Sequence, residues 1–241
     1  MDEQIREIFY SDDYESFYSM LNVRQQEKYD YVEHIIKTQR IVNSKFIKKI
    51  EGSEFYEARI SVGSDEYRTI VFAINASNFV DCSQVLFLNS FLKKDKKQYK
   101  KEVRKAEKLI EKYLEDWYMK KLDAEKLAQL RTSSEHFNEK YGPIDSPERK
   151  AFEARANAYY YAELLKTQRK MQKLTQQQLA EMIGKKREYI SQIERGNSDM
   201  QLSTFLQIAN ALGLKFAMVV GWFFLFIRFG QWILKLGSID L

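Results

Sequence analysis

The chain has 241 residues, of which 44% are hydrophobic and 30% charged, and its formal net charge is +5, so it can build one large or two small cores and mildly favours a polyanionic partner. Its single cysteine, Cys82, excludes an intramolecular disulfide and a cysteine-cluster zinc site, and its two histidines are too isolated for a histidine-based metal or catalytic site. No cofactor and no metal are therefore expected. The acidic N-terminus lacks the order of a signal peptide, which predicts a cytoplasmic protein.

The first half of the chain mixes helical and strand patterns. Apolar residues recur at helical spacing over residues 17–38. Runs rich in β-branched and aromatic residues follow at 55–61, 67–74 and 83–89, with turn signals between them. Three strands joined by short turns predict an antiparallel meander. A helix is expected to follow over residues 96–115.

Charged side chains gather on this predicted sheet and just after it. The side chains of Glu57 and Arg59 share one face of a strand, and an adjacent strand would bring Arg68 next to Arg59. Residues 93–112 hold ten basic and four acidic side chains. Judged by charge alone, a solvated helix face and surface arginines explain the same pattern. No nucleophile elbow, glycine phosphate loop or histidine–carboxylate set occurs in this half.

After residue 117 the pattern is helical throughout. The only two prolines mark a turn, and Asp145 or Ser146 is the expected N-cap of a helix over 148–166. Another helix is expected over 203–212.

Between those two helices, residues 174–196, LTQQQLAEMIGKKREYISQIERG, carry the most specific motif. Thr175 and Gln178 have the spacing of a capping box, and Gly184 is expected to end the first helix in left-handed geometry. A second helix then turns its isoleucines inward and its polar side chains outward. A short helix, a glycine turn and a second helix that begins with basic residues predict a helix-turn-helix whose second helix enters a DNA major groove.

This motif matches every fixed position of TQ-x-x-LA-x-x-x-G-x-x-x-x-x-IS-x-IE-x-G, and so resembles the XRE/HigA family of repressors and antitoxins. The resemblance implies operator DNA as a partner and a homodimer formed through the helix-turn-helix domain. The expected DNA-binding residues are Gln176, Gln177, Lys185, Lys186, Arg187, Tyr189, Ser191 and Gln192.

The order of charged motifs in the first half resembles the HigB branch of the RelE/ParE toxin superfamily. Glu-x-Arg, Tyr-Arg on the next strand, Phe-x-Lys-Lys and a lysine-rich helix follow one another over about residues 10–116. The chain departs from that branch at Asn89-Ser90, where His-Gly or Asn-Gly is usual, and at Tyr99, where proline is common. The resemblance implies a RelE-like antiparallel sheet with flanking helices.

The same resemblance implies a metal-independent endonuclease that cleaves mRNA on the ribosome through attack of a 2′-hydroxyl on the adjacent phosphate. Arg59 and Arg68 would stabilise the charge that gathers on the phosphoryl oxygens. Lys93 and Lys94 would contact phosphate and transfer a proton. The lysines expected to bind RNA are Lys96, Lys97, Lys100 and Lys101.

A toxin-like half thus precedes an antitoxin-like half in one α+β chain, with an all-α helix-turn-helix domain after the sheet domain. The expected divisions are a toxin domain at 1–116, a linker and antitoxin N-terminal segment at 117–147, a DNA-binding domain at 148–220 and a hydrophobic tail at 221–241. Residues 216–227 form an apolar run of twelve, which Arg228 interrupts. This run is too short to span a bilayer, so a membrane partner is not expected. A short strand over residues 215–220 is expected before the tail.

The function expected from these resemblances is a type II toxin–antitoxin protein that holds both components and represses its own transcription. Two alternatives stay open. One is a non-enzymatic helix-turn-helix transcription regulator with an inert N-terminal dimerisation or sensor domain. The other is a ParE-like gyrase-targeting toxin fused to the antitoxin, against which the arginine and lysine set argues.

Overall fold

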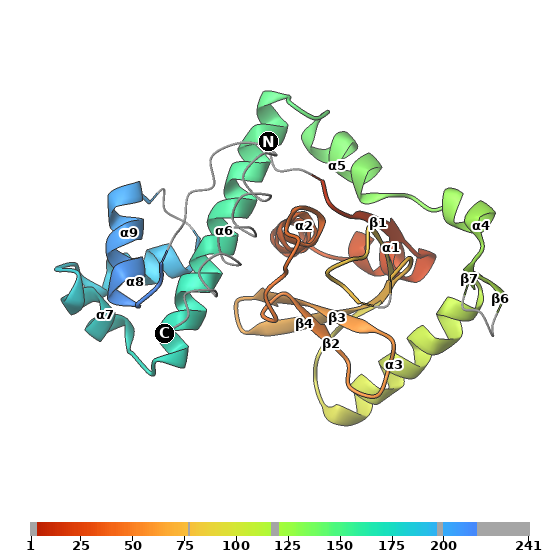
Figure 1. The fold of residues 1–241 in the computed structure, drawn as a ribbon, viewed down its shortest axis with the longest axis horizontal. Helices are drawn as coiled ribbons and strands as arrows, with labels where there is room; N and C mark the ends of the chain where they lie inside the picture. Colours follow the sequence, from red (N-terminus) through yellow and green to blue (C-terminus); the bar gives the residue numbers. More distant parts are fainter. Residues whose placement is uncertain (1–3, 77, 117–120, 197–199, 216–241) are drawn as a thin grey trace, which may run out of the picture.

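The structure is a computed structural model that describes residues 4–76, 78–116, 121–196 and 200–215. A mixed sheet domain and a small helical unit lie at the two ends of the molecule, and a long helix, α6, runs between them (Figure 1). The elements in chain order are β1 (Glu7–Tyr10), α1 (Asp12–Ser19), α2 (Val23–Thr38), β2 (Ile47–Lys49), β3 (Tyr56–Val62), β4 (Asp65–Ala73), β5 (Gln84–Leu92), α3 (Lys96–Glu111), β6 (Leu114–Asp116), β7 (Lys121–Leu122), α4 (Ala124–Ala128), α5 (Ser133–Tyr141), α6 (Pro147–Met171), α7 (Gln176–Met182), α8 (Arg187–Glu194) and α9 (Leu202–Ala211).

The main sheet has five strands in the order β1-β5-β4-β3-β2. Strands β3, β4 and β5 form the predicted antiparallel meander. The expectation of a purely antiparallel sheet was wrong, because β1 pairs with β5 in parallel. A parallel partner needs a crossover rather than a tight turn, and the helices α1 and α2 begin that long connection. The four-residue β1 is too short for its alternation to stand out in the sequence.

The two faces of the sheet pack against different helices. Val71, Val85 and Phe87 belong to the core under α1 and α2, whereas Ile70 and Leu86 belong to the core under α3. Successive side chains of a strand point to opposite faces, so each strand serves both cores. Cys82 is buried in the first core, as a small hydrophobic residue would be.

Helices α5 and α6 complete the first core, although they lie more than 90 residues after β1, α1 and α2. Phe137, Phe152, Ala156 and Tyr159 are buried together with the side chains of the sheet and α2. Figure 1 shows the first half of α6 beside α2 and its second half beside the helical unit. Residues 133–160, called the arm below, therefore join the N-terminal core to the helix-turn-helix.

Local signals explain where several helices begin. Asn22 forms a capping box with Gln25, so the helical region expected over 17–38 is divided into α1 and α2. Ser146 is the N-cap of α6 and Pro147 its first residue, as predicted. The expectation of helices alone after residue 117 was wrong, since β7 pairs with β6.

The expected strand over 215–220 and the hydrophobic tail at 221–241 lie outside the described residues, apart from Lys215. Within the part of the chain that the structure describes, no helix combines the length and the apolar character needed to cross a membrane.

Candidate nucleic-acid interfaces

The helix-turn-helix is fixed by its caps and its turn. Thr175 and Gln178 form the predicted capping box at the start of α7. Gly184 has a φ of 65°, a left-handed conformation that glycine adopts without strain, and it redirects the chain toward α8. These contacts are local, which is why the sequence predicts them well.

One small core holds the helices α7, α8 and α9 against the end of α6. Leu165, Leu179, Ile190 and Ile193 are among its buried members. Because Ile190 and Ile193 face this core, the other side of α8 is left for solvent. This arrangement confirms the predicted inward direction of the isoleucines.

A buried ion pair ties α8 to α6. Arg169 Nε and Nη2 donate to the two carboxylate oxygens of Glu194 at 2.5 and 2.9 Å. The same guanidinium donates to the carbonyl of Leu174, just before α7. Both charged side chains are less than a tenth exposed, so this paired contact sets the position of α8 relative to the long helix.

The predicted DNA-binding residues occupy two kinds of position. On α8 and just before it, Lys185, Lys186, Arg187 and Gln192 are exposed, and the ammonium of Lys185 lies 5.8 Å from the ring centroid of Tyr189. These side chains, with the half-buried Tyr189 and Ser191, border the solvent side of α8.

The two predicted residues on α7 are engaged within the protein. Gln176 is half-buried, and its amide nitrogen donates to Glu194 Oε2 at 2.8 Å. Gln177 is exposed and donates to Glu181 on the next turn at 2.7 Å. The Gln176 amide thus also supports the Arg169–Glu194 pair.

A second charged cluster lies on the sheet. Arg59 on β3 and Arg68 on β4 are directly opposite in the register, as predicted. Glu57 lies between them: its Oε1 accepts from Arg59 Nε at 2.7 Å, and its Oε2 lies 3.7 Å from Arg68 Nε. Arg68 also pairs with Glu66, at 3.2 Å.

Arg68 is buried, although the phosphate contact expected of it requires an accessible side chain. It is only 6% exposed. Its neighbours on β4 and β5 cover it, and its Nη1 also donates to the carbonyl of Tyr67. Arg59 is the more accessible of the two, with 30% of its side chain exposed.

Tyr99 connects the sheet to the start of α3. Its hydroxyl donates to Glu57 Oε2 at 2.7 Å. Burial raises the pKa of the Glu57 carboxyl, but the hydrogen bonds from Tyr99 and Arg59 outweigh it and hold that pKa below its usual value. Burial, followed by the bond to Glu57, raises the pKa of Tyr99, so this phenol stays protonated. The sequence showed Tyr99 only as a departure from the toxin pattern, and its contact with Glu57 was not predicted.

The lysines predicted from the sequence lie near Glu57 and Tyr99. Lys93, Lys94, Lys96 and Lys100 line an open pocket together with Glu57, Asp95 and Tyr99. Lys97 and Lys101 lie on the neighbouring exposed surface of α3, beside Arg104. The structure therefore brings Lys93, Lys94, Lys96 and Lys100 into one pocket with Glu57. The Glu57 carboxylate accepts a hydrogen bond from Arg59 and forms a longer ion pair with Arg68.

A third polar cluster joins the arm to α2 and was not predicted. Asp30 is buried and bonds to His136 Nε2 at 3.0 Å and Lys140 Nζ at 2.6 Å. Burial raises the pKa of Asp30, but His136 and Lys140 outweigh it and lower that pKa overall. No group of three or more histidine, cysteine, aspartate or glutamate side chains suited to a metal ion occurs among the residues described.

Comparison with known proteins bears on the C-terminal part of the chain. Residues 165–219 match a family model described as helix-turn-helix. The immunity repressor protein of Bacillus phage phi105 is 44% identical over 57 residues, which are 24% of this chain and 40% of the repressor. This chain thus matches about two fifths of the length of that relative.

A solved structure is similar to the chain over a segment of about the same size. It is the restriction-modification controller protein C.AhdI from Aeromonas hydrophila, at 30% identity. The match covers 25% of this chain and 88% of the controller protein, with a TM-score of 0.25.

Proposed function

We propose that this protein is a DNA-binding transcription regulator that reads an operator with α8. The observation that carries the proposal is the division of α8 into a buried apolar side and an exposed side, with basic residues at the start of the helix and the amide of Gln192 further along it. Helices of this kind place their N-terminal residues against base edges in the major groove. The name of the phage relative, an immunity repressor, agrees with this role.

The positions of the side chains suggest their tasks on DNA. Arg187 and Gln192 are long, exposed donors suited to base edges. Lys185, Lys186 and Tyr189 can reach phosphates or base edges nearby. Gln176, which already bonds to Glu194, supports α8 from the start of α7, where the backbone N–H groups suit a phosphate. A homodimer on a palindromic site is part of the proposal.

A titration of the full chain against the DNA upstream of its own gene tests these roles of the side chains. Arg187→Ala is expected to cost about 1–3 kcal/mol and to relax specificity at one base position. Lys186→Ala is expected to weaken binding to all sequences and to reduce the slope against salt by about one. Both are measured by fluorescence anisotropy at two salt concentrations, with Lys150→Ala, an exposed lysine at the start of α6, as the control. Unchanged affinity and specificity in both variants would remove α8 from the reading role.

We further propose, as a second function, that the sheet cluster cleaves mRNA and that the C-terminal part restrains it. The observation that favours this function is the convergence of Arg59, Arg68 and the lysines of the α3 start on Glu57 and Tyr99. Cations placed beforehand stabilise the negative charge of a phosphoryl transition state. Arg59, Lys93 and Lys94 are the accessible cations for this task, and Lys96, Lys97, Lys100 and Lys101 extend the surface for RNA.

The contacts of Arg68 assign it a different task within this proposal. It is buried and paired with Glu57 and Glu66, so it positions Glu57 and keeps the two strands in register. Arg68→Ala would leave two carboxylates with a lost partner and disturb the fold. Arg59→Ala is the cleaner test of phosphate contact, because Arg59 is more exposed and lies at the end of the cluster.

The segment 1–116, expressed alone in a bacterium, is expected to arrest growth and cut transcripts, and co-expression of residues 119–241 is expected to relieve the arrest. Mapping transcript ends measures the cleavage. Arg59→Ala with Lys94→Ala should lower cleavage by about 10²-fold or more, since each removes stabilisation of the transition state. Lys108→Ala, an exposed lysine in the last turn of α3, is the matched control.

A soluble, folded segment 1–116 that leaves growth and transcripts intact would rule out the nuclease and favour the non-enzymatic regulator. Double-strand DNA breaks without transcript cleavage would indicate the gyrase-directed alternative. Neither result touches the DNA-binding proposal, which rests on α8.

A further inference from the structure

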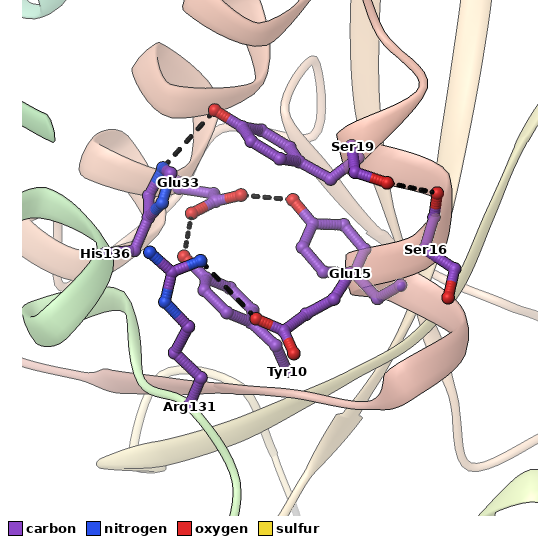
Figure 2. Close-up of a pocket in the computed structure, with 9 residues that line it drawn as sticks. Tyr10, Glu15, Ser16, Ser19, Glu33, Arg131 and His136 are labelled. Carbon is purple, nitrogen blue, oxygen red and sulfur yellow. Dashed lines mark hydrogen bonds and ion pairs between the residues drawn. The ribbon is translucent and has the colours of Figure 1, made fainter.

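A cavity of ≈ 350 Å³ lies between the start of the sheet domain and the arm. Three tyrosines line it, Tyr10 from β1 and Tyr14 and Tyr18 from α1, and Figure 2 shows Tyr10 among the lining side chains. Glu33 on α2 lies on its inner side, and Arg131 and His136 contribute from just before and within α5. The size is within the range of sites for small molecules.

Glu33 is a buried carboxylate that forms no ion pair within 4 Å among the described residues, although His136 acts on it electrostatically from a greater distance. Its residue is 1% exposed, and its two oxygens accept hydrogen bonds from the hydroxyls of Tyr10 and Tyr14. These donors are neutral and use two of the roughly four acceptor positions of a carboxylate. Burial, the largest cause, raises the pKa of Glu33 to about 7. Buried charges are costly unless they are paired, so Glu33 would gain from an incoming cation.

The basic groups around the cavity already bond to other carboxylates. Arg131 lies 3.5 Å from Glu15 and bonds to Glu139 (Figure 2 draws the first contact). His136 bonds to Asp30, which also binds the ammonium of Lys140. The balance of charge around the cavity is therefore acidic.

We propose that this cavity binds a small organic cation of the alkylammonium class, with its charged nitrogen against Glu33 and its carbon atoms among the tyrosine rings. An ammonium group supplies the donors that the two remaining acceptor positions of Glu33 can use. The faces of aromatic rings attract cations, and more strongly where water is excluded. The chain thereby gains a ligand site that depends on neither DNA binding nor RNA cleavage.

A ligand in this cavity would stabilise the docking of the arm on the sheet domain. Tyr10, Tyr14 and Glu33 belong to the sheet domain, whereas Arg131 and His136 belong to the segment that leads into the arm. A bound ligand contacts both parts and stabilises their docking. Since α6 continues from the arm to the helix-turn-helix, the site lies where a sensor function would be connected to α8.

Isothermal titration of the full chain with n-butylammonium chloride tests the proposal. n-Butanol is the neutral probe of the same shape, and sodium chloride keeps the ionic strength constant. Saturable binding of n-butylammonium is expected, with n-butanol about tenfold or more weaker. Glu33→Gln should weaken n-butylammonium by a similar factor, whereas the exposed Glu51→Gln should leave it unchanged.

A second variant leaves the buried network intact. Ser16 is exposed on α1 and lines the cavity, so Ser16→Phe should fill the cavity and abolish binding. Circular dichroism verifies the fold of each variant. Absence of saturable binding, equal binding of n-butylammonium and n-butanol, or unchanged binding in Ser16→Phe would each overturn the proposal.

Discussion

Arg169→Met is expected to lower the local stability of the helix-turn-helix by about 3–5 kcal/mol, because it leaves the buried Glu194 carboxylate without its charged partner. Loss of the guanidinium also frees the carbonyl of Leu174 before α7. Hydrogen exchange of the full chain measures the effect, since the amides of α8 report the free energy of local opening. Operator binding should fall with it, because α8 loses its fixed position.

The matching double variant separates charge from packing. Arg169→Met with Glu194→Leu removes both charges, and such replacements of a buried pair are often neutral or stabilising. We expect it to recover most of the lost local stability. If Arg169→Met alone costs less than about 1 kcal/mol, the ion pair does not hold α8 in place.

Phe152→Ala is expected to destabilise the sheet domain and the arm by about 3–5 kcal/mol. Phe152 is fully buried, stacks on Tyr141 with ring centroids 3.9 Å apart, and has the rings of Phe137 and Tyr31 at 5.3 and 5.9 Å. Removing its ring leaves a cavity between α2, α5 and α6. Urea unfolding of the full chain, followed by the fluorescence of its aromatic side chains, measures the change in the free energy of unfolding.

Met171→Ala is the control for that variant, because Met171 is 73% exposed near the end of the same helix. Its effect should stay within about 0.5 kcal/mol. Equal effects of Phe152→Ala and Met171→Ala would show that the arm is not docked as described.

The helix-turn-helix was predictable because its determinants are close in sequence. The cap of α7 spans three residues, Gly184 sets the turn, and Ile190 and Ile193 follow the helical period. The register of Arg59 against Arg68 was also predictable, since a short hairpin turn joins β3 to β4 and leaves little freedom in pairing.

Contacts between distant parts of the chain were not predictable. Asp30 and His136 are 106 residues apart, and neither the helical period nor the charge pattern relates them. The pairing of β1 with β5 and the docking of the arm have the same origin in long-range packing. Arg68 lies on β4, which is an inner strand between β5 and β3, so its burial follows from the order of the strands and not from its residue type.

Reading of a specific DNA sequence by α8 is testable in one fluorescence anisotropy titration. The full chain is titrated against the DNA upstream of its own gene and against a scrambled duplex of the same composition, in the same salt. The upstream duplex is expected to bind about 10³-fold more tightly or better, as the operators of specific regulators do. Equal affinity for the two duplexes would show that α8 does not read the sequence.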